Sequence, residues 1–264
     1  MIVRMAPRRR ESSPAGPGRP GAAPSPPSAE GGLRARLGGL AVLLAVGTFG
    51  TVFGLSVSAS GTAYVWHLNM ISDLGDTSCH VRDHRWICSP GHDLFNTGLV
   101  LTGGLLAAAG GLLRQLWGRA LAWSVAAMGV GLVVAGVFTA TEHAALHLVG
   151  VVLAIVVPGL GLLWSAIRPA TAWLDSSRVV RGLLAGVALV LAAESRLPDP
   201  VVPRGAGELV MVLCLVAALV VEVTRLRPGS GQPQGPTSRS AGGTGATGSP
   251  SRRPAPRNGA SARR

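Results

Sequence analysis

The sequence predicts an all-α polytopic membrane protein with six transmembrane helices in a bundle, and three observations lead to this prediction. Only 14% of the 264 residues are charged, whereas soluble domains usually carry about a quarter. Six apolar stretches approach the roughly 20 residues that a helix needs to cross a bilayer. The arginines are concentrated in the segments that would lie on one side of such a membrane.

The apolar stretches are separated by polar segments. They run over about 38–59, 94–113, 120–139, 144–167, 179–193 and 209–223. The fifth is short unless it starts near Ser177. The first could instead be a cleaved signal peptide, but its apolar run exceeds the roughly 7 to 15 residues typical of such segments. We therefore expect a retained anchor.

The apolar stretches divide the chain into three regions. Residues 37–226 form the predicted transmembrane domain, with a long outer loop over 60–93, and residues 1–36 and 227–264 form basic tails rich in Pro, Gly, Ser and Arg. We expect both tails to be disordered, because they contain too little apolar surface to offset the entropy of ordering. Without interleaved aromatic residues they offer no platform for nucleic-acid bases. The expected partners are the lipid bilayer and anionic lipid headgroups, bound by the arginine tails, and the sequence identifies no protein partner.

The distribution of arginine predicts the orientation. With a cytoplasmic amino terminus, 20 of the 24 arginines fall in cytoplasmic segments, as the positive-inside rule requires. Both termini are then cytoplasmic. The chain contains no lysine and is rich in Ala, Gly, Pro and Arg, which is typical of a GC-rich bacterial genome. We therefore expect the bacterial plasma membrane.

Polar chemistry gathers on the predicted outer side, which receives all six histidines and most of the carboxylates. We expect an outer-face pocket built from the first loop and the starts of the second and fourth helices. The candidate catalytic carboxylates are Asp73, Asp93 and Glu142. Glu142 also has a simpler interpretation, because Thr139 and Glu142 form a T-x-x-E capping box that would begin the fourth helix.

Two histidines stand one helical turn apart at the start of the fourth helix. The spacing of His143 and His147 places both rings on one face. The candidate third ligand of a Zn²⁺ site is His92, with Asp73 and Asp93 as the alternatives. No HExxH-type motif accompanies them, and no cofactor is expected. The alternative is that His143 lies in the membrane interface and that neutral His147 hydrogen-bonds a neighbouring helix.

Cys79 and Cys88 lie nine positions apart in the outer loop, where the compartment allows disulfides. We interpret them as a disulfide, with free thiols or metal ligation as the alternatives.

Near the cytoplasmic end of the sixth helix, Glu222 is expected to pair with Arg225.

The chain also resembles a known family. An I-S-D-L-G segment (Ile71 to Gly75) follows the first apolar stretch, a Phe95-Asn96 dipeptide opens the second, and residues 143–150 begin a central helix with histidines. This combination resembles the bacterial and archaeal membrane proteins called domain of unknown function 998 and, more loosely, the DRAM/Sfk-type membrane proteins. The resemblance implies a six-helix bundle without an established reaction. It adds Ser72, Gly75 and Asn96 to Asp73, His92, His143 and His147 as pocket residues.

Three functions are compatible with these features. A non-enzymatic role in membrane organisation, sensing or partner assembly is favoured, because the sequence contains no strong catalytic constellation. A metal-dependent membrane hydrolase would use the outer histidines and carboxylates. A transporter of small molecules or lipids would need polar groups at mid-membrane depth, which are scarce here.

Overall fold

The computed structural model of the chain describes residues 29–167 and 176–226, which are mostly helical. Most of the two predicted tails lies outside these ranges. The first helix, α1 (Ala29–Ser60), begins inside the segment 1–36 that we expected to be a disordered tail. Residues 29–37 are mainly Ala, Leu, Arg and Glu with two glycines, and these strong helix formers allow the helix to extend beyond its apolar stretch.

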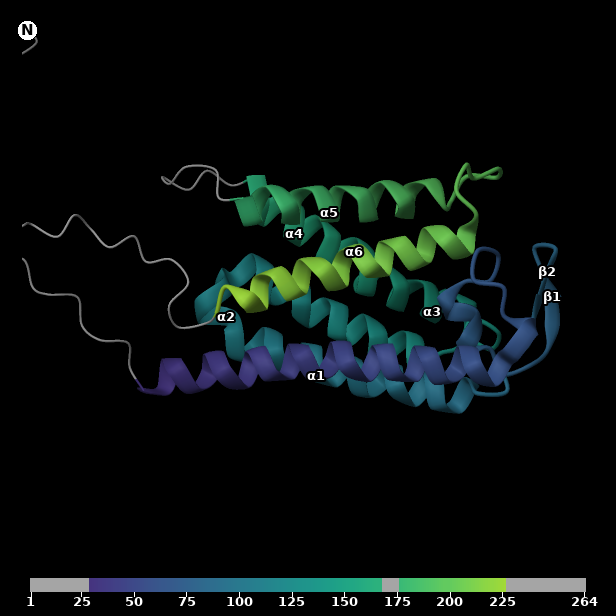
Figure 1. Cartoon of the computed structure of the whole chain (residues 1–264), viewed down its shortest axis with the longest axis horizontal. Coiled ribbons are helices and arrows are strands. Elements are labelled where there is room, and N and C mark those ends of the chain that lie inside the picture. Colours follow the sequence, from purple (N-terminus) through teal and green to yellow (C-terminus); the bar gives the residue numbers. More distant parts are fainter. Residues whose placement is uncertain (1–28, 168–175, 227–264) are drawn as a thin grey trace, which may run out of the picture. The chain divides into compact units, whose positions relative to one another are not determined.

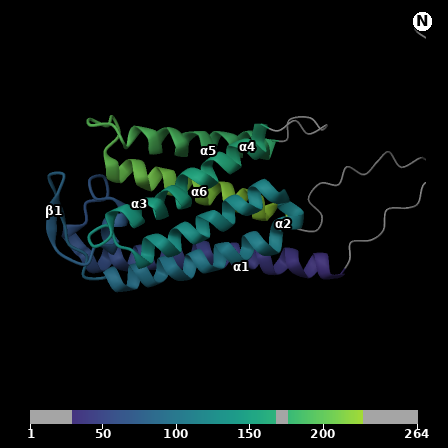
Figure 2. The same cartoon turned by 180° about the vertical axis from the view of Figure 1, so that it is seen from behind.

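Among the described residues, five helices are long and apolar enough to cross a membrane, judged by length and composition. Four of them are α1, α2 (His92–Val137), α5 (Ser176–Glu194) and α6 (Arg204–Thr224). The other is a continuous helix over Ala144–Ile167, which consists of α3 (Ala144–Val151), the π-helical η3 (Val152–Val156) and α4 (Val157–Ile167). Figures 1 and 2 show these helices lying along a roughly common direction. The weak fifth apolar stretch therefore does form a helix long enough to qualify.

Helix α2 contains two of the predicted apolar stretches and reverses at Gly118. Gly118 has φ 77° and ψ 166°, a conformation that favours glycine because it has no Cβ. The two arms pack antiparallel. Gly103 in the first arm meets the backbone of Gly129 in the second, and Gly110 meets that of Ala122, with no room for a Cβ at either glycine of the first arm. The polar segment around Arg114 is helical rather than a loop.

The second arm of α2 also packs closely on the helix that follows it. A Cβ on Gly131 would meet the backbone of Gly150, Leu153 and Ala154, the last two at the π-helical segment. Such close contact between backbones is the usual role of small residues in membrane helices. It places α3, and with it His147, against the end of α2.

Residues 61–91, which we call the cap, connect α1 to α2 at one end of the helices (Figure 1). The cap contains η1 (Gly61–Ala63), η2 (Ile71–Gly75) and an antiparallel hairpin of β1 (His80–Arg82) and β2 (Arg85–Ile87). The positive φ values of Asp83 and His84 are those of a two-residue type I′ turn. This hairpin is an exception to the all-α prediction.

Two apolar clusters hold the helices together. The cluster beneath the cap consists of Val52, Ile71, Leu74, Phe95 and Leu99. The larger cluster lies toward the end of the helices opposite the cap, which we call the far end, and includes Val42, Leu113, Leu162, Ala188 and Leu215.

A buried ion pair joins α5 and α6 at the far end. The predicted contact between Glu222 and Arg225 is confirmed, with 3.7 Å between the carboxylate and the guanidinium. The sequence did not reveal the closer partner, because Arg181 of α5 bonds directly to the same carboxylate oxygen. Arg181 and Glu222 are both buried, so each neutralises a charge that would otherwise be costly to bury.

The close contact between α2 and α3 can be tested at one glycine. Gly131→Ala should lower the free energy of unfolding by about 1–3 kcal/mol, because the added methyl group must displace backbone rather than a flexible side chain. Gly104→Ala is the matched control, since nothing lies within 4 Å of a Cβ at that position. Thermal unfolding of both variants in detergent measures the difference. Equal midpoints for the two variants would refute the close contact.

Candidate functional site: a cavity beneath the cap

The η2 turn is fixed to the hairpin through the buried carboxylate of Asp73. Both oxygens of Asp73 accept from Arg85, from Nε at 2.9 Å and from Nη2 at 3.2 Å, and the backbone N–H of Met70 donates to Oδ2 at 2.8 Å. Such a bidentate pair is strong and directional. Burial lowers the pKa of the Arg85 guanidinium, but the carboxylates of Asp73 and Asp83 outweigh this and raise it overall.

Side chains from the surrounding helices hold the backbone of η2 itself. Asn96 of α2 donates to the carbonyl of Gly75 at 3.0 Å. Glu208 of α6 accepts from the backbone N–H groups of Ile71 and Ser72. A Cβ on Gly75 would collide with the amide oxygen of Asn96, so this position needs glycine.

Further contacts hold the cap together and join it to the segment before α3. Ser89 donates to the carbonyl of Leu74 at 2.6 Å. Thr141, just before α3, donates to the buried carboxylate of Asp76 at 2.6 Å.

Burial raises the pKa of the Tyr64 phenol, and the nearby carboxylates of Glu208 and Asp73 raise it further, so the phenol stays neutral.

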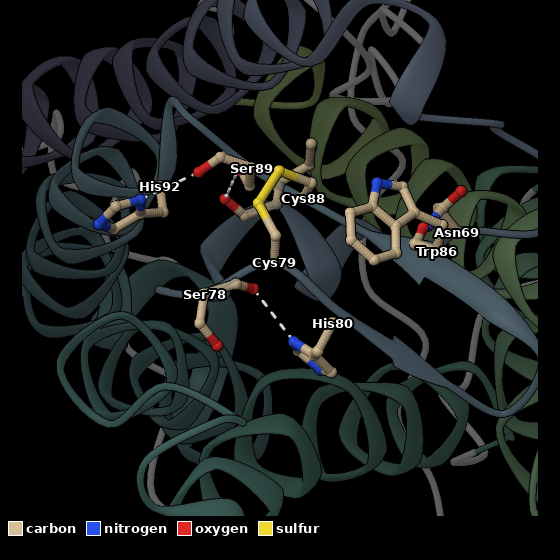
Figure 3. The surroundings of a disulfide bond; sticks show 9 residues. Asn69, Ser78, Cys79, His80, Trp86, Cys88, Ser89 and His92 are labelled. Atoms are coloured by element: carbon tan, nitrogen blue, oxygen red, sulfur yellow. Dashed lines mark hydrogen bonds between the residues drawn. A yellow bond between two sulfur atoms is a disulfide. The ribbon is translucent and has the colours of Figure 1, made fainter.

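The sulfur atoms of Cys79 and Cys88 lie at disulfide-bonding distance, with 4.2 Å between the two Cα atoms. Figure 3 shows this bond at the end of the hairpin opposite its turn, where it joins the residue before β1 to the residue after β2. Trp86 lies beside Asn69, and the side-chain amide of Asn69 donates to the Trp86 carbonyl at 2.8 Å. The predicted pairing is therefore confirmed at the level of distance. By closing the hairpin, the bond restricts the strand that carries Arg85.

A cavity lies directly beneath the cap, between α1, the two arms of α2, α3 and α6. It has about 940 Å³ of empty space, its open mouth included. Its polar lining comes from Ser72, Asn96, Thr102, Thr139, His147 and Glu208. All of these except Thr102 lie near the cap, so most of the polar lining is at that end.

Away from the cap the cavity becomes an apolar shaft. Phe49, Leu106, Met128, Leu215 and Leu219 line it. Leu219 stands about 22 Å along α6 from Arg204, at 1.5 Å per residue, so the shaft reaches well into the depth of the helices. Val42 and Leu113, farther along α1 and α2, belong to the fully buried core and do not line the cavity.

Four of the predicted pocket residues line this cavity, namely Ser72, Gly75, Asn96 and His147. Asp73 lies behind η2 in the ion pair with Arg85 and does not line it. His92 instead contacts the carbonyl of Ser89, as Figure 3 shows. His143 is exposed, and its ring packs against Phe138.

The candidate catalytic carboxylates do not come together. Asp73 is paired with Arg85, the side chain of Asp93 is 96% exposed, and exposed Glu142 accepts from Thr77 at 3.3 Å. Within residues 29–167 and 176–226, no group of three His, Cys, Asp or Glu side chains could hold a metal ion. The zinc site at His92, His143 and His147 stays a prediction without a geometric basis in this part of the chain.

The capping box of the fourth helix forms only in part. The N–H of Glu142 donates to the hydroxyl of Thr139 at 3.3 Å. The helix itself begins at Ala144, because Thr139 to His143 form a separate turn in which the N–H of His143 bonds to the carbonyl of Thr139.

Sequence reasoning did not single out two residues of the site, Glu208 and Arg85. Glu208 could have been found as an ionisable side chain inside an apolar helix, which is a functional candidate by default. Arg85 gave no such signal, because one arginine in a polar loop has many possible partners.

Comparison with protein-family profiles, with curated proteins and with solved structures gives no match for this chain. The resemblance to domain of unknown function 998 therefore stays a prediction.

The ion pair between Asp73 and Arg85 should be needed for a folded cap. Arg85→Leu removes the bidentate partner of the buried Asp73 carboxylate and leaves the Arg82 guanidinium 3.9 Å away, and breaking a buried ion pair typically costs about 3–5 kcal/mol. The matched control is Arg204→Leu, whose guanidinium lies 3.9 Å from the half-exposed carboxylate of Asp83 and should contribute about 0–1 kcal/mol. Limited proteolysis within residues 61–91 measures the opening of the cap. Equal cleavage rates in the two variants would contradict this role.

Proposed function

We propose that this chain is a non-enzymatic protein of the bacterial plasma membrane, which binds an amphipathic molecule of the outer leaflet and serves in sensing or membrane organisation. The observation that carries the proposal is the cavity, with polar groups gathered near the cap and an apolar shaft below. Such a gradient fits a molecule with a polar head and an apolar chain. Pockets that are mostly apolar with a few convergent polar groups are typical of small-molecule sites.

We further propose six crossings with both termini in the cytoplasm. Two features support this topology. The two antiparallel arms of α2 provide two crossings from one helix, and 20 of the 24 arginines then lie on the cytoplasmic side. The cap, with its disulfide, lies outside in this arrangement, where disulfides persist.

The two alternatives gain less support from the geometry. A hydrolase needs its carboxylates near the bound molecule, whereas Asp93 and Glu142 are exposed away from the cavity lining and Asp73 is neutralised by Arg85. Glu208 does line the cavity, but its carboxyl group already accepts from the backbone of η2. A transporter needs a path to the far side. The cavity instead stops short of the buried core around Val42 and Leu113.

The arginine tails are proposed to hold the protein against anionic headgroups of the cytoplasmic leaflet. This proposal rests on charge alone, because most of both tails lies outside the described residues. Each arginine near such a surface contributes about 1 kcal/mol.

The number of crossings can be tested by labelling single cysteines in the full chain, in a Cys214→Ala background. A membrane-impermeant maleimide should label Leu197→Cys in intact cells, because this exposed residue lies in the proposed outer loop between α5 and α6. Arg119→Cys, next to the reversal of α2, should be labelled only after the membrane is permeabilised. Labelling of Arg119→Cys in intact cells would rule out the cytoplasmic reversal.

Occupancy of the cavity can be tested by filling it. Val212 of α6 lines the shaft, whereas its neighbour Leu213 is 57% exposed on the outside of the helices. Val212→Trp should lower retention of amphipathic lipid by about tenfold, a change that corresponds to 1.4 kcal/mol, and Leu213→Trp should leave it unchanged. Native mass spectrometry of the two variants measures the bound lipid. Equal retention in both would show that lipid binds elsewhere.

A further inference from the structure

Two buried polar atoms of the cavity lining have no hydrogen-bond partner among the described residues. They are Nε2 of His147 and Oγ1 of Thr102. A buried polar group without a partner typically costs about 1–3 kcal/mol, so such atoms in a cavity wall indicate the chemistry of its occupant. Thr102 is 3% exposed, which excludes bulk solvent as its partner.

The hydrogen bonds of His147 determine what its free nitrogen can do. Nδ1 lies 3.0 Å from the carbonyl oxygen of Phe138 and 3.2 Å from that of Ala135. Both are acceptors at the end of α2, where carbonyls lack helical partners. Nδ1 therefore carries a hydrogen, and in the corresponding neutral tautomer Nε2 holds a lone pair that accepts.

The charge of the lining restricts the occupant further. Among the described residues, no arginine lines the cavity, and the carboxyl group of its lining is that of Glu208. A phosphate or carboxylate head would find no arginine in this lining to pair with, and burying an unpaired charge is costly. A neutral head with an O–H group meets no such penalty.

Resting on the proposed function, we propose that the cavity takes a lipid alcohol, whose hydroxyl group donates a hydrogen bond to Nε2 of His147 while its apolar chain fills the shaft between α2 and α6. The hydroxyl of Thr102, toward the shaft, offers a second polar contact to heads with more than one hydroxyl group. Lipid alcohols in this sense include monoacylglycerols and isoprenoid alcohols.

The experiment compares three probes with the same chain, 1-hexadecanol, its methyl ether and hexadecanoate, on the full-length protein in nanodiscs. Each competes against a photoreactive hexadecanol analogue, so that relative affinities follow from loss of cross-linking. The methyl ether keeps the chain and the oxygen atom of the alcohol but has no O–H group with which to donate a hydrogen bond. One net hydrogen bond makes the alcohol about three- to tenfold tighter than the ether, and hexadecanoate should be the weakest.

His147→Phe should bring the ratio of alcohol to ether affinity close to one. The matched control is His143→Phe, one helical turn away and outside the cavity lining, which should keep the wild-type ratio. Because both affinities are measured in the same variant, a general loosening of the fold cancels from the ratio.

A ratio near one in the wild-type protein, or hexadecanoate binding tighter than the alcohol, overturns this inference while the proposed function stands. These comparisons need no variant, so they decide the question even where His147→Phe does not fold. A ratio unchanged by His147→Phe overturns the role of Nε2. Absence of binding by all three probes and by the photoreactive analogue overturns the proposed function itself.

Discussion

The structure of the cap end depends on how the five-residue turn Ile71–Gly75 satisfies its backbone. A short 3₁₀ turn leaves N–H and carbonyl groups without internal partners, and buried backbone groups must be paired. Side chains from three other elements provide the pairs. Glu208 of α6 takes the first N–H groups, Asn96 of α2 takes the last carbonyl, and Arg85 of β2 holds Asp73 within the turn. The turn thus joins segments far apart in the sequence.

This arrangement explains why polar chemistry and an apolar cavity coexist at one end of the helices. Charged groups of the cap, such as Asp73 and Arg85, are paired on the side of η2 away from the cavity. The side that faces the cavity presents Ser72 and the backbone near Gly75. Because the strong charges are satisfied among themselves, few polar groups remain to receive a bound molecule, and those few determine its chemistry.

The sequence predicts the helices well and the cap poorly, for a physical reason. Apolar length is a local property, so the stretches that form α1, α2 and α6 can be recognised one by one. The bond between Glu208 and Ile71 spans 137 positions, and no local pattern encodes such a contact. The motif residues Asn96 and Gly75 could each be named as a position of interest from the family resemblance. Only their geometry shows that the amide of one binds the carbonyl of the other.

Helix α6 brings these observations together, because it carries a buried carboxylate near each end. Glu208 is bonded to the cap, and Glu222 is bonded to Arg181 of α5. Over its whole length, α6 packs extensively on α5 but only sparsely on α1. Val212, Leu215, Val216 and Leu219 of its middle section line the shaft. The polar contacts near both ends of α6 add to the packing of its buried residues Met211, Leu215 and Leu219 in the core. They help to hold the helix in place, so space for an apolar chain can remain beside Val212 and Val216 without loss of the fold.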